Sequence, residues 1–153
     1  MQFHQLDDAN VINKSILTFG NFDGIHLGHK YLINNLISLA KKNKLKSILV
    51  TFDPHTNAIL SNKNFKVITP FSKKKEILVR YDIDIICKIN FDKEFSKLDA
   101  DSFMDIIIKK YNPKIILIGY DNFFGYRKSG SYNYLKKSNK YKNIEIMALD
   151  QYK

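Results

Sequence analysis

The sequence predicts an α/β fold: a Rossmann-like three-layer α/β/α sandwich with a mostly parallel sheet. Three observations predict it. Short apolar runs rich in branched residues recur along the chain, segments with helical spacing of apolar residues lie between them, and the runs themselves are apolar on both faces. Strands of that kind belong in a parallel sheet that helices cover on both sides. At 153 residues, the chain has room for one domain with its own core.

Five segments are expected to be strands, because each is a short apolar run bounded by polar, Gly, Pro or Asn residues. They are Ser15–Gly20, Lys46–Phe52, Asp84–Ile89, Lys114–Tyr120 and Asn143–Leu149. The single cysteine, Cys87, lies in the third run, where we expect a buried thiol. The terminus before Ser15 is polar, so no strand is expected there and His4 is assigned no role.

Four segments between the strands are expected to be helices, because their apolar residues recur with helical spacing or follow a turn signal. They are Leu27–Asn43, Ser72–Tyr81, Asp99–Tyr111 and Ser131–Ser138. Asp99 is a natural N-cap. Ligands of such sheets bind beyond the carboxyl ends of the strands. We therefore expect the chemistry in the loops Gly20–His29, Asp53–Thr56 and Tyr120–Gly130.

The chain is basic, with 25 Lys and Arg against 15 Asp and Glu and a net charge of +10. Only Arg80 and Arg127 are arginines, and base readout and bidentate phosphate contacts favour the guanidinium over the lysine ammonium. Lysine runs such as Lys41-Lys42 and Lys73-Lys74-Lys75 are expected on solvated helix faces. We therefore expect no nucleic-acid partner.

The apolar runs of the sequence give no indication of a signal peptide or a membrane span. Residues 1–14 contain no apolar core of a signal peptide, and no apolar run is long enough to span a bilayer. We expect a soluble, cytoplasmic protein that does not bind membranes. The sequence leaves its oligomeric state open.

The first loop combines glycines with a histidine pair. The stretch Gly20-Asn21-Phe22-Asp23-Gly24 leaves the first expected strand, and His26-Leu27-Gly28-His29 opens the first expected helix. Histidines three residues apart share one face of the first helical turn, where free amides and the helix dipole attract anions. Gly28 puts no side chain in the way of a phosphate. This pattern predicts a triphosphate site; ordinary loop histidines, or metal ligands with Asp23, are the alternatives.

Three motifs, in order along the chain, resemble those of the bacterial FAD synthetases. These are the FMN adenylyltransferase modules of bifunctional riboflavin kinase/FAD synthetases, within the HxGH nucleotidylyltransferase superfamily. The motifs are Thr18–His29, Thr51-Phe52-Asp53-Pro54-His55 and Gly119–Gly130, and Asp92–Leu98 is also similar to that family. The resemblance covers nearly the whole chain.

The resemblance implies a nucleotidyltransferase that transfers the adenylyl group of ATP to FMN, giving FAD and pyrophosphate, with Mg²⁺ and no covalent enzyme intermediate. It implies catalytic roles for His26, His29 and Asn21. The implied ATP contacts are Gly20, Phe22, Asp23, Gly24, Gly28 and Lys128, and the implied flavin contacts are Phe52, Pro54, His55, Asp121 and Phe124. No metal ligand is identified.

Several of these residues have a structural alternative. Phe52 and Phe124 are as well suited to the core as to a flavin, because an aromatic residue at a strand end usually packs. His55 follows Pro54, so it could simply satisfy backbone groups of a turn. Asp23 could cap the helix or orient a histidine.

The chain departs from the family pattern at Thr56, where a second proline is usual, and at Lys128, where arginine is usual. It ends at Lys153, before the family's Ser-Ser-Thr-x-x-Arg type segment and any riboflavin kinase module. We therefore expect residues 1–153 to be a nucleotidylyltransferase domain without its last motif. The alternatives are another HxGH nucleotidylyltransferase, or a nucleotide- or flavin-binding module without efficient turnover.

Overall fold

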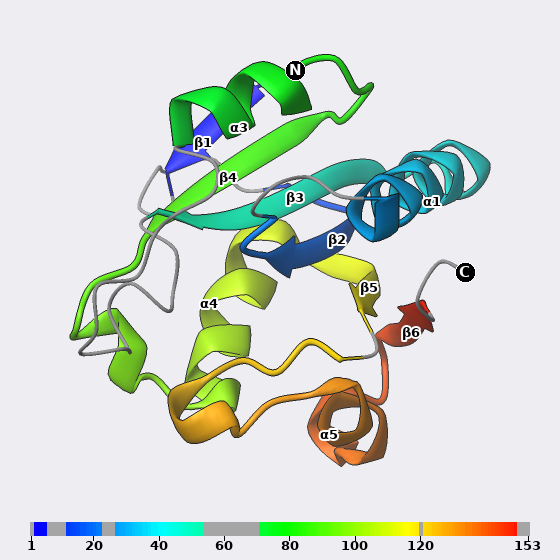
Figure 1. Ribbon diagram of the computed structural model, residues 1–153. Helices are drawn as coiled ribbons and strands as arrows, with labels where there is room; N and C mark the ends of the chain where they lie inside the picture. The colour runs from blue at the N-terminus through cyan, green and yellow to red at the C-terminus, as the bar shows by residue number, and fades with distance from the viewer. Residues whose placement is uncertain (1, 6–11, 23–26, 54–70, 120, 150–153) are drawn as a thin grey trace.

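In the computed structural model, the chain forms a parallel sheet with helices on both faces (Figure 1). The structure describes residues 2–5, 12–22, 27–53, 71–119 and 121–149. Its strands are β1 (Gln2–Gln5), β2 (Ser15–Gly20), β3 (Lys46–Asp53), β4 (Ile85–Asn90), β5 (Pro113–Gly119) and β6 (Glu145–Leu149), in the order β1-β4-β3-β2-β5-β6. Every neighbouring pair is parallel, so the predicted α/β sandwich is confirmed.

The first strand is a correction to the sequence analysis, which expected none before Ser15. β1 pairs with β4, and His4 lies opposite Cys87 in the register. The His4 side chain is buried and its ring is stacked on that of Tyr111. Four mostly polar residues carry no strand signal of their own; the open edge of β4 supplies their hydrogen-bond partners. Cys87 is a buried, free thiol, as predicted.

The helices are α1 (Leu27–Asn43), α3 (Phe71–Leu78), α4 (Ala100–Tyr111) and α5 (Tyr132–Lys137). α1 has the predicted bounds, and the predicted helix Ser72–Tyr81 ends earlier, at Leu78. The Asp99 side chain caps α4 by accepting a hydrogen bond from the backbone N–H of Ser102 at 2.8 Å. None of the helices that the structure describes is long and apolar enough to cross a membrane.

Alternating side chains of the strands divide the core into two layers. On β2, Ile16 packs with α1 and α3 on one face of the sheet, whereas Leu17 and Phe19 pack with α4 and α5 on the other. This alternation follows from the two-residue period of a strand. Figure 1 shows the resulting sandwich, with α1 and α3 on one side of the sheet and α4 and α5 on the other.

Strand order reverses beside β2. From β2 the chain builds one half of the sheet through β3 and β4, and it then returns to the other side of β2 with β5 and β6. In open parallel sheets, ligands bind outside the carboxyl ends of the strands at such a reversal. A ligand is therefore expected beside the residues that follow β2 and β5.

Candidate functional site

The carboxyl ends of β2, β3 and β5 bring the described parts of the three sequence motifs to one edge of the sheet. Gly20–Phe22 leaves β2, Thr51–Asp53 ends β3, and Gly119 ends β5 shortly before Asp121. A side chain on Gly119 would have its Cβ 3.6 Å from Oδ1 of Asp121, so this carboxylate lies close to the strand end. Asp121 is exposed and accessible to a ligand.

Hydrogen bonds join these three segments. The side-chain amide of Asn122 donates to the carbonyl oxygen of Phe19 at 2.9 Å, which links the third motif to β2. The hydroxyl of Thr51 donates to the carbonyl oxygen of Asn21 at 3.1 Å, which links the end of β3 to the first loop. The end of β2 is therefore bonded to the third motif, and Asn21, at the start of the first loop, is bonded to the end of β3.

Lys74 is a residue of this edge that the sequence analysis missed. Its ammonium donates to the carbonyl oxygen of Asn21 at 2.5 Å and to the hydroxyl oxygen of Thr51 at 3.2 Å. The side chain is only 4% exposed, so the expectation that Lys73-Lys74-Lys75 lies on a solvated face is wrong at its middle residue. A signal existed: Phe71, Lys74 and Leu78 have the spacing of one helix face, which puts a lysine in an apolar stripe.

The residue after Asn21 has an unusual backbone. Phe22 has φ of 51°, a left-handed conformation that is uncommon outside glycine and concentrated at functional sites. Its ring is buried with the α1 layer and meets the ring of His29 edge-on, with 5.2 Å between the centroids. His29 lies in the first turn of α1. Because the ring is buried, the predicted contact of Phe22 with ATP would be made by its backbone.

The third loop is closed on itself and docked on α4. Phe124 and Gly130 exchange two backbone hydrogen bonds of 3.0 and 2.8 Å. A side chain at Gly130 would put a Cβ 2.5 Å from the Phe124 ring, so only glycine fits there. The Ser129 hydroxyl accepts a hydrogen bond from the N–H of Ala100, at the start of α4. These hydrogen bonds fix the conformation of the loop, in which the side chain of Lys128 is exposed to solvent.

The rings of Phe52 and Phe124 belong to the core. Both are less than 10% exposed and pack in one layer with Phe19 and Phe103; Phe124 lies 4.8 Å from Phe19 and 5.7 Å from Phe103 between centroids. Phe52 lies 6.1 Å from Phe103. The alternative of core packing is therefore confirmed for both rings, and any contact of theirs with a flavin stays a prediction.

Part of the predicted site lies outside the described residues: Asp23, Gly24, His26, Pro54 and His55. Gly28 lies in α1. Among the described side chains, no group of three His, Cys, Asp or Glu comes together as a metal site. The described part of the site thus consists of strand ends, a helix start and the buried Lys74.

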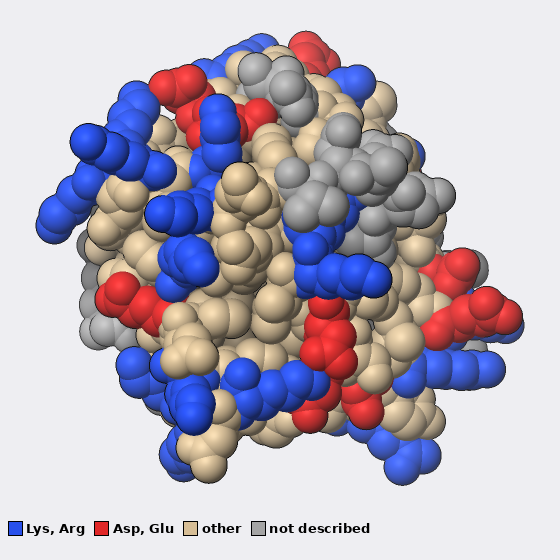
Figure 2. Space-filling model, turned by 180° about the vertical axis from the view of Figure 1, so that it is seen from behind, with Lys and Arg blue, Asp and Glu red and all other residues tan. Residues whose placement is uncertain are grey.

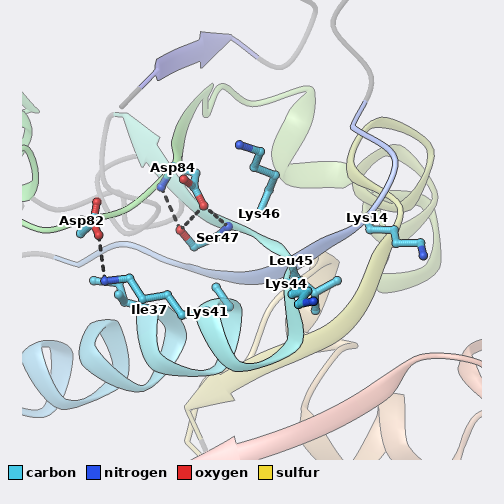
Figure 3. Close-up of a pocket in the computed structure, with 10 residues that line it drawn as sticks. Lys14, Ile37, Lys41, Lys44, Leu45, Lys46, Ser47, Asp82 and Asp84 are labelled. Atoms are coloured by element: carbon cyan, nitrogen blue, oxygen red, sulfur yellow. Dashed lines mark hydrogen bonds and ion pairs between the residues drawn. The ribbon is translucent and has the colours of Figure 1, made fainter.

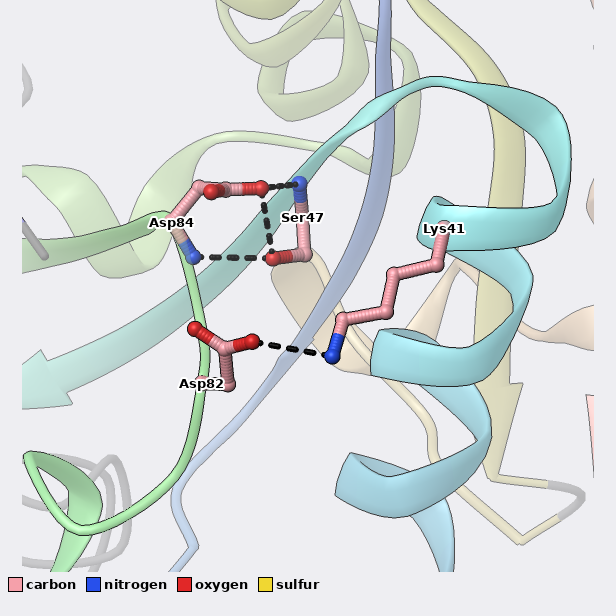
Figure 4. A network of polar contacts seen from close by, with 4 residues as sticks. All are labelled: Lys41, Ser47, Asp82 and Asp84. Atoms are coloured by element: carbon pink, nitrogen blue, oxygen red, sulfur yellow. Dashed lines mark hydrogen bonds and ion pairs between the residues drawn. The ribbon is translucent and has the colours of Figure 1, made fainter.

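A cavity of about 330 Å³ lies at the opposite end of the sheet, near the amino ends of β3 and β4 (Figure 3). Its lining includes Lys14, Lys41 and Lys46, which point in different directions and do not converge on one anion. Ser47 and Asp84 bond reciprocally through backbone and side chain, and Lys41 pairs with Asp82 at 3.0 Å (Figure 4). These contacts join strand β3 and helix α1 to the segment before β4, so we assign them a structural role.

Comparison with known proteins identifies the family to which this chain belongs. The model of the FAD synthetase family matches residues 8–153. The chain belongs to the FAD synthetase family. A bifunctional riboflavin kinase/FMN adenylyltransferase of Buchnera aphidicola subsp. Schizaphis graminum is 39% identical over 151 residues, which are 95% of this chain and 48% of that protein. The protein of the same description from Listeria monocytogenes is 32% identical over 133 residues, 86% of this chain and 42% of its own length.

The chain spans about half the length of the curated relatives that it matches, or somewhat less than half. A solved structure described as a macrolide-efflux protein from Streptococcus pneumoniae has the same fold, with a TM-score of 0.82 and 26% identity over 97% of this chain and 50% of its own. The family follows from the family model and the curated relatives, both of which name flavin enzymes.

Proposed function

We propose that this chain transfers the adenylyl group of ATP to FMN, giving FAD and pyrophosphate. The observation that carries the proposal is that the ends of three FAD synthetase motifs meet at the carboxyl edge of the sheet, beside the reversal of strand order, and are hydrogen-bonded to one another. An edge of this kind in a parallel sheet is the usual place for a nucleotide. We place the reaction in the cytoplasm, where both substrates are available.

In the proposed reaction, a phosphate oxygen of FMN attacks the α-phosphorus of ATP. The bond from that phosphorus to the oxygen that bridges to the β-phosphorus breaks, and pyrophosphate leaves with the electron pair. No covalent intermediate with the protein is needed, so the protein contributes positioning and stabilisation of charge. His29, with His26, would contact the ATP phosphates at the start of α1, where backbone amides also attract anions.

The first loop would hold the nucleotide. Asn21 would contact the reacting phosphates, and the backbone of Gly20, Phe22, Asp23 and Gly24 would surround them, with Gly28 allowing close approach at the helix start. Because hydrogen bonds from Thr51 and Lys74 hold the Asn21 carbonyl, the described start of the loop, Gly20–Phe22, would have its conformation before ATP binds. Preorganised donors of this kind stabilise a developing charge without reorganisation during the reaction. Lys128 would add positive charge from the third loop.

The flavin would lie between the second and third loops. Asp121 is exposed there, and Pro54 and His55 follow β3 directly in the sequence. Phe52 and Phe124 would support this region from the core beneath. FMN bound in this position would lie beside the first loop, as attack on ATP requires.

The residues described at this edge fit a Mg²⁺ ion that is held mainly by the substrate phosphates. Magnesium at nucleotide sites is bound mainly by substrate phosphates and water, with only one or two protein carboxylates, so a group of three protein ligands is not required. Asp53, at the end of β3, and Asp121 are the carboxylates that the structure describes at this edge. Bound Mg²⁺ would offset part of the negative charge of the phosphates.

Isotope transfer tests the proposal. ATP labelled at the α-phosphorus should give labelled FAD when it is incubated with the protein, FMN and Mg²⁺. Label in the product of another acceptor, such as nicotinamide mononucleotide, and none in FAD would identify a different nucleotidylyltransferase. Binding of both ligands without any labelled product would identify a binding module. Quenching of flavin fluorescence alone does not separate these outcomes.

A further inference from the structure

A buried lysine connects α3 to two motif-bearing segments. Lys74 reaches from the middle of α3 to the carboxyl ends of β2 and β3, where its ammonium meets the Asn21 carbonyl and the Thr51 hydroxyl. The Thr51 hydroxyl also donates to the same carbonyl at 3.1 Å, so the three groups form a closed triangle of hydrogen bonds. The lysines on either side of Lys74 in α3, Lys73 and Lys75, are exposed.

The burial of this ammonium needs an explanation. Taking a charged group and a long flexible side chain out of water costs free energy, and an apolar side chain would fill the same helix face more cheaply. Leu78, one turn further along the same face, is fully buried. The positive charge of Lys74 is thus placed at this edge at a cost in stability, which is typical of groups kept for function.

The contacts of Lys74 lead to His29. Asn21 accepts from Lys74, the next residue takes the left-handed conformation, and the ring of Phe22 then packs against the ring of His29. A change in the position of the Asn21 carbonyl would alter the turn at Phe22 and hence the packing of His29. The contact of Lys74 with Asn21 therefore influences the position of both described residues that follow β2, Asn21 and Phe22.

We infer that Lys74 is a positioning residue of the adenylyl-transfer site: it holds the first loop through the Asn21 carbonyl, and its charge favours a polyphosphate at this edge. This inference rests on the proposed function. It predicts that Lys74 matters more for ligands with more phosphate charge, because Coulomb attraction grows with the charge of the ligand. A lysine with only a structural role would affect all nucleotides equally.

Calorimetric titration of the full chain with ATP, ADP and adenosine tests this. The Lys74→Met variant should bind ATP about tenfold more weakly and adenosine less than about twofold more weakly, with ADP between them. The control is Lys73→Met, which removes the same charge from an exposed position of the same helix and should leave all three affinities within about twofold. Lys74→Arg, which keeps the charge, should retain most of the preference for ATP.

If Lys74→Met does not melt cooperatively, Lys74→Gln replaces it, since the amide keeps an N–H donor for the Asn21 carbonyl and removes the charge. Equal losses for ATP and adenosine, or an ATP affinity that matches that of Lys73→Met, would overturn the inference and leave the proposed function intact. Failure of the wild-type chain to bind any of the three ligands would overturn both.

Discussion

At the scale of single residues, the site depends on a few side chains that hold the backbone of the first loop. Phe22 has a left-handed backbone and a buried ring, and its contact with His29 connects the loop to the first turn of α1. Backbone strain of this kind persists only where the surroundings maintain it, and here Lys74 and Thr51 hold the preceding carbonyl.

We expect His29→Ala to weaken ATP binding and to slow adenylyl transfer by about a hundredfold, while FMN binding persists. The reason is the position of His29 in the first turn of α1, where anions are stabilised. ATP titration and the isotope assay measure the two effects. Asn34→Ala, an exposed change on the same helix, is the control and should alter neither. Transfer by His29→Ala at the wild-type rate would show that the phosphate site is elsewhere.

Asp121→Ala should impair FMN binding more than ATP binding, because Asp121 is exposed beside β5, where we propose the flavin. Flavin fluorescence and ATP calorimetry compare the two affinities. Phe124→Ala is a poor probe of the same site: it would leave a cavity in the core, at a cost of about 3–5 kcal/mol in the free energy of unfolding. An equal loss of both ligands in Asp121→Ala, with a lower melting temperature, would point to structural damage.

At the scale of elements, a cluster of polar groups joins α4 to the segment after α5. The Tyr141 hydroxyl donates to Asp101 on α4 at 2.5 Å, and Lys140 pairs with Asp105 at 2.8 Å. The hydrogen bond from Tyr141 lowers the pKa of Asp101 below its usual value. Burial, reinforced by this carboxylate, raises the pKa of Tyr141. These contacts hold the segment that follows α5 against α4.

Tyr141→Phe should lower the free energy of unfolding at pH 7 by about 1–2 kcal/mol, because it removes a hydrogen bond to a carboxylate. Since the pKa of Asp101 is depressed in the folded state, this stabilisation is present above the unfolded value of about 4 and is lost as the pH falls through the folded pKa. Urea denaturation at several pH values should therefore show the difference between wild type and variant narrowing in acid.

The control for this experiment is Tyr126→Phe, which removes the same hydroxyl from an exposed ring. It should change stability little at any pH. A deficit in Tyr141→Phe that stays constant from pH 7 to pH 3 would contradict the assigned role of the Asp101 carboxylate.

At the scale of the whole molecule, basic and acidic side chains are interspersed over the face of the molecule shown in Figure 2, among the residues that the structure describes. Figure 2 shows Lys and Arg side chains spread over the face seen there, with Asp and Glu among them. The lysines around the cavity at the amino end of the sheet also diverge (Figure 3). The +10 charge should therefore give only diffuse attraction to polyanions.

We expect any complex with DNA or RNA to be weak and to disappear at about 150 mM salt, since diffuse lysine contacts act through counterion release. Gel-shift titrations at low and physiological salt measure this. Poly-glutamate of matched charge is a control, because a non-specific attraction should treat it like nucleic acid. A band shift that survives physiological salt would contradict this prediction.

Local features of the fold and site were predictable from the sequence. The strands β2 to β6, the helix α1 and the Asp99 cap all depend on residues within one short segment. The strand β1 was not predictable, because four mostly polar residues form a strand only through pairing with β4. The core position of Phe52 and Phe124 stayed ambiguous, because an aromatic residue at a strand end has the same local pattern in either role.

By itself, the sequence determined the α/β class, the order of strands and helices along the chain, and the three motifs that mark the family. These properties are carried by periodicity and by contiguous residues. Only the tertiary structure decided the order of strands in the sheet, the partners of the Lys74 ammonium and the bonds that join the motifs. The physical reason is sequence distance: Lys74 meets Asn21 across 53 residues, and Asn122 meets Phe19 across 103. Such contacts form only when the sheet assembles, so no local pattern encodes them.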